Sequence, residues 1–161
     1  MQWNYDRLRA RLEGLTDDEF FWEPIAGCWT IYQDRPAHWT YHYAIPDPKP
    51  APLTSIGWQI VHLATCKVMY HEWAFGPARL TFPELVIPHT AEGGIEMLDD
   101  GQQRLRNALA GLSDPHLDEP RKTNWGELWP AWRVFSAMAD HDAFHGGAIG
   151  NLRDMYQWSR A

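Results

Sequence analysis

The sequence DHDAFHGGAIGNLRDMY, residues 140–156, holds two histidines four positions apart, His141 and His145. Its apolar residues recur at helical spacing, which predicts a helix with both imidazoles on one face and Cβ atoms about 5–6 Å apart. Two imidazoles placed in this way can share one cation, as paired histidines on a single helix do in zinc enzymes. The alternative is two core histidines that each bond a neighbour, since a metal needs a third ligand and burial does not.

A third histidine, His62, lies in another apolar helical pattern, on a stripe that also holds Trp58 and Cys66. Burying three neutral imidazoles without polar partners is unfavourable, whereas coordination satisfies three ring nitrogens at once. Three protein ligands with an open position are the arrangement of a catalytic metal rather than a closed structural one. His62, His141 and His145 are therefore the predicted ligands. Cys66, one turn after His62, could approach the same centre, although a small buried core residue is the simpler interpretation.

Other patterns that could carry chemistry are less complete. Asp142-x-x-His145 is half of a di-iron carboxylate motif without its Glu-x-x-His partner, and His71-Glu72 lacks the second histidine of HExxH. Asp140 and Asp142, which flank the first histidine of the pair, could orient an imidazole, act as a base or be solvated. No glycine-rich phosphate loop, dinucleotide fingerprint or GxSxG elbow is present. A metal is thus the only chemistry that the motifs predict, and no catalytic residue is assigned.

Four long helices must position these residues. Apolar periodicity and capping residues predict helices over residues 2–14, from Thr54 or Ser55 to about Phe75, from Thr90 onward, and from about Pro130 to Trp158. The last helix has an inward stripe formed by Trp132, Phe135, Met138, His141, His145, Ile149, Leu152 and Tyr156. No strand-like alternation of any length is present. The predicted fold class is therefore all-α, a helical bundle in one domain over residues 1–161.

The first connection contains a second helix signal. TDDE at residues 16–19 predicts a capping box, in which Thr16 accepts from the backbone amide of Glu19 while the Glu19 side chain reaches back. A short helix then carries Phe20, Phe21 and Trp22 and ends before Pro24.

Residues 23–52 hold six prolines and predict a long, ordered but irregular loop. Loops of this length inside a compact domain are usually functional lids or disordered segments, and the many aromatic residues argue against disorder. We expect the loop to pack over the site. The candidate pocket residues are Trp29, Tyr32, Trp39, Tyr41 and Tyr43 from the loop, with Trp58 and Cys66 from the helix that follows it.

Composition limits the partners and the compartment. The formal net charge of −7, with no concentrated basic patch, argues against nucleic acid as a partner. The N-terminal residues are charged throughout, unlike a signal peptide, and no stretch approaches the roughly 20 apolar residues that span a bilayer. Two cysteines, Cys28 and Cys66, are too few for a disulfide framework. A reduced, cytoplasmic protein is expected.

Three segments in this order resemble the DinB-like family of small metal-binding helical proteins. LTDDEFFWEPIAGCW at residues 15–29 resembles the family's segment after its first helix, and TSIGWQIVHLA at residues 54–64 resembles its second helix. DHDAFHGGAIGNLRDMY resembles the final helix, with HxxxH, glycine and a Leu-Arg-x-x-Tyr ending. The family is related to thiol-dependent S-transferases and to mycothiol-dependent maleylpyruvate isomerases.

The resemblance implies a four-helix bundle of up-down-down-up topology, often dimeric, in which His62, His141 and His145 bind one divalent metal, usually zinc or nickel. It also implies that a low-molecular-weight thiol such as mycothiol or bacillithiol binds the metal as its thiolate and attacks a small electrophile. Two alternatives stay open. The site could instead activate water for hydrolysis, or the chain could be a non-catalytic metal-binding or structural bundle, such as a stress-related dimer, with the histidines as packing residues or a metal staple.

Overall fold

The long helices begin where the sequence places their caps. In the computed structural model, which describes residues 1–46 and 48–161, the Ser55 hydroxyl accepts from Trp58 N at the start of α3 (Ile56–Phe75). The Thr90 hydroxyl accepts from Gly93 N at the start of α4 (Ala91–Ala110). Pro130 precedes α5 (Ala131–Arg160). These three predicted helices are confirmed, with ends shifted by only a few residues.

The first helix is shorter than predicted. The spacing predicted a helix over residues 2–14, but α1 covers Gln2–Ala10, and the chain then turns through residues 11–14 to Gly14, whose φ is +69°. Glycine adopts this left-handed conformation at little cost, so the turn ends the helix early.

The capping box at α2 (Asp17–Phe20) is half formed. Thr16 Oγ1 accepts from Glu19 N at 3.3 Å, as predicted. The Glu19 carboxylate does not return to the cap. It is buried and accepts from Arg153 Nε on α5 at 2.7 Å, because a charged partner compensates the burial of a carboxylate better than a backbone amide does.

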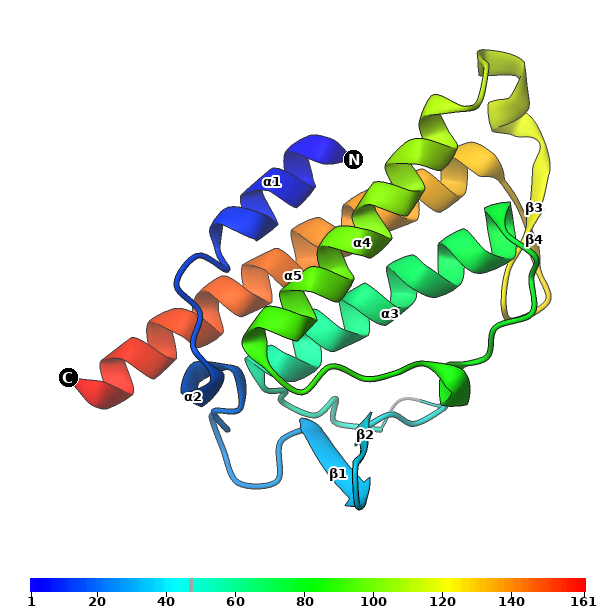
Figure 1. Cartoon of the computed structure of the whole chain (residues 1–161). Helices are drawn as coiled ribbons and strands as arrows, with labels where there is room; N and C mark the ends of the chain where they lie inside the picture. Colours follow the sequence, from blue (N-terminus) through cyan, green and yellow to red (C-terminus); the bar gives the residue numbers. More distant parts are fainter. Residues whose placement is uncertain (47) are drawn as a thin grey trace.

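Helix α3 lies between α4 and α5, and α1 packs along α5 (Figure 1). In Figure 1, α3 and α4 run in one direction while α1 and α5 run in the other, so the chain after α3 must return along the helices before α4 begins. The core between them includes Leu8, Phe20, Ile60, Leu98 and Ile149, all essentially inaccessible. Trp132, predicted to point inward from the last helix, is half exposed instead, because it lies in the first turn of α5.

Two short antiparallel hairpins interrupt the helical fold, which corrects the expectation of no strands. Strand β1 (Ile31–Arg35) pairs with β2 (His38–Tyr41) inside the predicted irregular loop, and β3 (Pro120–Lys122) pairs with β4 (Leu128–Pro130) before α5. Short 3₁₀ turns, η1 (Phe82–Glu84) and η2 (Asp114–Asp118), lie in the other connections.

Across residues 1–46 and 48–161, the helices lack the combination of length and apolarity that crossing a membrane requires.

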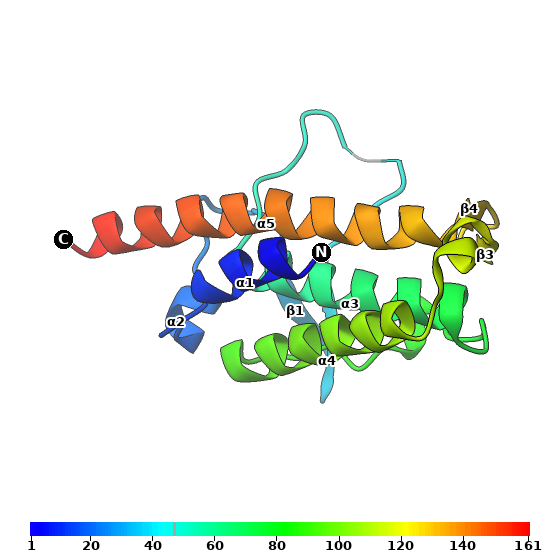
Figure 2. The same cartoon turned by 90° about the horizontal axis from the view of Figure 1, so that it is seen from above.

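The loop between α2 and α3 is tied at its two ends. Trp29 N donates to Leu53 O and Ser55 N donates to Trp29 O, both at 2.8 Å, so the chain leaves and re-enters the helical body at one point. Between these ends the segment that leads into α3 arches beyond α5 (Figure 2).

Candidate metal centre

The three predicted histidines converge between α3 and α5. Ring centroids lie 5.1 Å apart for His62 and His145, 5.5 Å for His141 and His145, and 6.2 Å for His62 and His141. Cys66 joins them from the next turn of α3, and ligand atoms of His62, Cys66 and His141 all lie within 4.8 Å of one another. The structure thus brings the three predicted histidine rings near one another, but the group whose ligand atoms lie within this distance is His62, Cys66 and His141, and His145 is not part of it.

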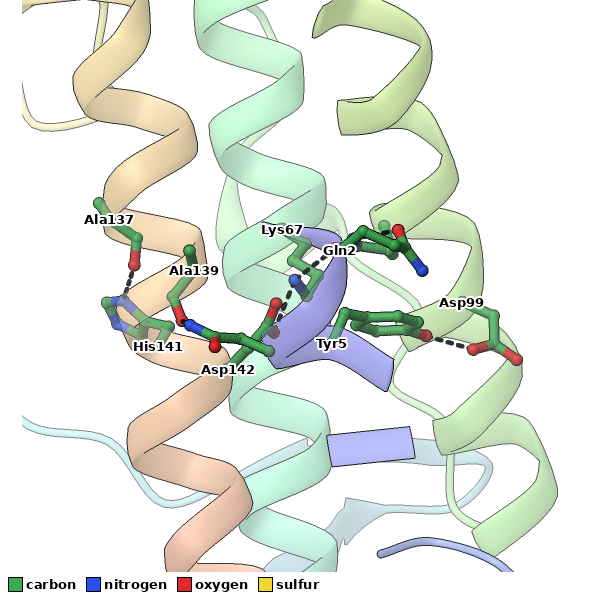
Figure 3. Close-up of polar contacts among 10 residues, drawn as sticks. Gln2, Tyr5, Lys67, Asp99, Ala137, Ala139, His141 and Asp142 are labelled. Atoms are coloured by element: carbon green, nitrogen blue, oxygen red, sulfur yellow. Dashed lines mark hydrogen bonds and ion pairs between the residues drawn. The ribbon is translucent and has the colours of Figure 1, made fainter. Parts of the chain in front are cut away.

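Two of the rings are oriented by oxygen acceptors in the way that metal-binding histidines usually are. His141 Nδ1 donates to the carbonyl of Ala137, one turn earlier on α5, at 3.0 Å (Figure 3). His145 Nδ1 donates to Gln59 Oε1, and Gln59 Nε2 in turn donates to Thr54 Oγ1 at 2.6 Å. With the proton held on Nδ1, Nε2 of each ring carries the lone pair that a cation requires.

Burial shifts the pKa values of His145 and Cys66. His145 is 5 % exposed, and its burial, with smaller contributions from His62 and His141, lowers its pKa to about 3. The ring is therefore neutral at physiological pH, which is the form that binds metals. Burial also raises the pKa of the Cys66 thiol to about 12, against a smaller opposing effect of Lys67. Cys66 Sγ lies 3.8 Å from His62 Nε2 and is a thiol until a cation displaces its proton.

Aromatic side chains wall the cavity beside the histidines. Trp58 stacks on His62, with centroids 4.7 Å apart and planes 8° apart, and its Nε1 donates to His42 O at 2.7 Å. The cavity, of about 460 Å³, is lined by Trp29, Tyr43, Trp58, His62, Asp140, His141, Phe144 and His145. It leaves space beside the imidazoles for a small molecule.

The predicted lid residues divide into two groups. Trp29, Tyr43 and Trp58 line the cavity. Tyr32, Trp39 and Tyr41 are absent from its described lining: Tyr32 packs on His42, Trp39 stacks on His89 with centroids 4.8 Å apart, and Tyr41 contacts Trp58 and Thr65. The hairpin β1–β2 therefore packs beside the walls of the site rather than over it.

Gln59 and Phe144 were not singled out from the sequence. Gln59 precedes His62 by three positions, so a polar residue on the histidine's own helical face was the available signal. Phe144, 73 % exposed, packs edge-on against His145 with centroids 5.2 Å apart. A lone exposed phenylalanine carries no comparable signal, because single exposed apolar residues are common.

A buried ion pair joins the two helices that carry the donors. Lys67 Nζ lies 2.7 Å from Asp142 Oδ1, both side chains are fully inaccessible, and Lys67 also donates to Gln102 on α4 at 2.8 Å. Each partner directly follows a candidate donor in the chain, Cys66 or His141, and Figure 3 shows His141 and Asp142 pointing to opposite sides of α5. Asp142 is therefore neither a solvated residue nor a base of the cavity. The pair holds α3 against α5 on the side of α5 opposite to His141.

Comparison with known proteins places this geometry in a family. A sequence model of the DinB superfamily matches residues 1–149, a range that includes His62, Cys66, His141 and His145. The chain belongs to the DinB superfamily. Membership of the DinB superfamily is compatible with metal binding, in agreement with the group of histidine and cysteine donors. No protein of curated function matches the chain.

Proposed function

We propose that this DinB superfamily protein binds one divalent metal through His62, His141 and His145. The observation that carries the proposal is the convergence of three imidazoles from α3 and α5, two of them with Nδ1 bonded to a protein oxygen. Imidazole donors with a thiol nearby suit zinc or nickel better than magnesium or calcium, which prefer oxygen ligands.

The proposed reaction is transfer of a low-molecular-weight thiol, of the mycothiol or bacillithiol type, to a small electrophile. When bound, the metal lowers the pKa of such a thiol and orients it for attack. The chain supplies the rest. Gln59 and Trp58 hold the rings of His145 and His62, while Trp29 and Tyr43 wall a cavity with space for the reactants.

One observation favours a second function. The ligand atoms of Cys66, His62 and His141 lie within 4.8 Å of one another, so Cys66 is a candidate donor in addition to the three histidines, and closed four-donor sites are structural rather than catalytic. A non-catalytic metal-binding bundle is therefore the alternative. Turnover of an electrophilic ester without added thiol would instead indicate a hydrolase.

The proposal extends to assembly and location. The helix directions in Figure 1 support the up-down-down-up arrangement of a four-helix bundle. A cytoplasmic homodimer is proposed from the family resemblance, and light scattering of the purified chain tests the dimer.

Isothermal titration with zinc tests the centre. We expect about one zinc per chain, with affinity lowered by about 100-fold or more in His62→Ala, His141→Ala and His145→Ala, because each removes a ligand. The matched control is His71→Ala, which removes a histidine from α3 outside the cluster. A wild-type chain that stays metal-free after incubation with zinc, nickel and manganese would overturn the proposal.

Cobalt substitution separates the two functions. A cobalt-loaded chain with only imidazole ligands lacks the intense near-ultraviolet thiolate-to-metal band, whereas ligation by Cys66 produces it and Cys66→Ala removes it. The catalytic proposal then requires thiol-dependent conversion of a model electrophile such as monochlorobimane, lost in His145→Ala. A thiolate band together with no turnover for any thiol would establish the structural alternative.

A further inference from the structure

A second pocket lies beside the metal centre, between residues 48–54 and α5. Its volume is about 480 Å³, and its walls are mostly apolar, with Pro52 and Leu53 on one side and Ala148, Leu152 and Met155 of α5 on the other. Among the lining residues that the structure describes, none carries a formal charge. Pockets of this size and composition are typical of small-molecule sites.

The apolar pocket and the metal cavity adjoin each other. Trp29, Trp58, Phe144 and His145 line both of them. Trp29 and Trp58 pack together with centroids 5.8 Å apart, and Phe144 lies against His145. A molecule seated in the apolar pocket therefore lies beside His145, which belongs to the imidazole cluster.

A few polar side chains line this pocket among its apolar residues. Besides Asn151, they are Thr54, Gln59 and His145, which form one hydrogen-bonded chain that leads to the imidazole cluster. Leu53, Phe144 and Met155 line it as well, although they are 52 %, 73 % and 48 % exposed. Covering such surface with an apolar ligand releases water from it and is favourable by about 25 cal/mol per Å².

We propose that this pocket binds the apolar body of the substrate while the reactive group lies at the metal centre. The substrates are accordingly uncharged small molecules in which the electrophilic group is attached to an aromatic ring or a hydrocarbon group of similar size. The assignment rests on the proposed function for the reactive end, whereas the binding of the apolar body depends only on the pocket.

Fluorescence titration with 1-aminoanthracene, a neutral probe whose emission rises in apolar surroundings, tests the pocket without any metal. We expect saturable binding, competition by benzyl alcohol and none by glycerol. Ala148→Trp fills the pocket from α5 without touching the metal cavity and is expected to weaken probe binding by about tenfold or more. Ser136→Trp, an exposed position of the same helix outside both cavities, is the matched control and leaves binding unchanged.

A second pocket variant keeps the test valid if Ala148→Trp fails to fold. Met155 is at the rim, so Met155→Glu introduces a charge without disturbing the core, and it is expected to weaken the probe while the circular dichroism spectrum is retained. Zinc titrations of all variants run in parallel, and both pocket variants are expected to bind zinc within about twofold of the wild type.

The outcomes are distinct. Absence of saturable probe binding in the wild type, or unchanged binding in both pocket variants, overturns the pocket whatever zinc does. If the wild type binds no zinc, but binds the probe and the two pocket variants weaken that binding, the proposed metal function is wrong and the apolar site is supported. If Met155→Glu converts a dimer into a monomer in light scattering, and the probe does the same, a second copy of the chain occupies the pocket and the substrate assignment is wrong.

Discussion

At the scale of single residues, the centre depends on how each imidazole holds its proton. The acceptor of His145 is a side chain, Gln59, whereas that of His141 is a backbone carbonyl that no substitution removes. The spacing of His141 and His145 predicted that they lie on one side of a helix, because positions four apart on a helix share a face. The position of Gln59 on the helical face of His62 was a signal in the sequence, but the sequence does not show that its side chain faces a ring on another helix.

We expect Gln59→Leu to lower zinc affinity by about 10–100-fold, since acceptors behind metal-binding histidines have effects of this size. Competition with a chelating dye measures the affinity. Gln103→Leu, on the exposed face of α4, is the control and leaves it unchanged. Unaltered affinity in Gln59→Leu would exclude His145 from the ligand set.

The cysteines provide a separate prediction. Burial, with a smaller effect of Glu23, raises the pKa of the Cys28 thiol to about 11, and burial raises that of Cys66 to about 12. Because the thiolate is the reactive form, neither thiol of the folded, metal-free chain should react quickly with a disulfide reagent at pH 8, and reaction should accelerate as pH rises. Ser136→Cys supplies an exposed thiol for comparison. Rapid labelling of a native cysteine at pH 8 would contradict the prediction.

At the scale of helices and strands, contacts between elements explain what the sequence could and could not predict. Serine and threonine caps marked the starts of α3 and α4, and apolar spacing marked their inward faces. The hairpins were missed because strands of three to five residues are too short to show alternation. Glu19 was assigned to its local cap because the sequence shows Thr16, three residues away, but not Arg153 across the fold.

The Lys67–Asp142 pair should be costly to break from one side only. We expect Lys67→Met to lower the free energy of unfolding by about 3–5 kcal/mol, because Asp142 would remain buried without its cation. Lys67→Met combined with Asp142→Leu should recover most of this loss. Urea denaturation measures both, with Arg104→Met, which breaks the exposed pair with Asp100, as a control of about 0–1 kcal/mol. A small effect of Lys67→Met alone would mean that Asp142 is hydrated or protonated in the variant, because burial raises the pKa of this carboxyl.

Two glycines should respond oppositely to alanine. A Cβ at Gly57 would lie 2.8 Å from the Phe20 carbonyl oxygen, where α3 meets α2, so Gly57→Ala is expected to destabilise the fold by about 1–3 kcal/mol. A Cβ at Gly147 meets nothing within 4 Å, so Gly147→Ala should stabilise the middle of α5 by about 0.5–1 kcal/mol. Thermal denaturation compares them, and stabilisation by Gly57→Ala would contradict the packing of α2 on α3.

At the scale of the whole molecule, a metal that joins α3 to α5 links binding to folding. Zinc at about 100 times its dissociation constant should stabilise the fold by about 2.7 kcal/mol, which raises Tm by roughly 5–10 °C for a chain of this size. Calorimetry with and without a chelator measures the shift. His141→Ala should show no shift, and an equal shift in that variant would place the zinc elsewhere.

The tie between Trp29 and residues 53–55 has a consequence for how this protein can diversify. Since the connection departs and returns at one point, its length can change while the register of α3 and the positions of the imidazoles stay the same. Each doubling of a flexible loop costs only about 0.6 kcal/mol of closure entropy. Part of the wall of the apolar pocket lies on this segment and the candidate donors lie on the helices, so under the proposed function the residues that bind the substrate body can change while the metal centre stays the same.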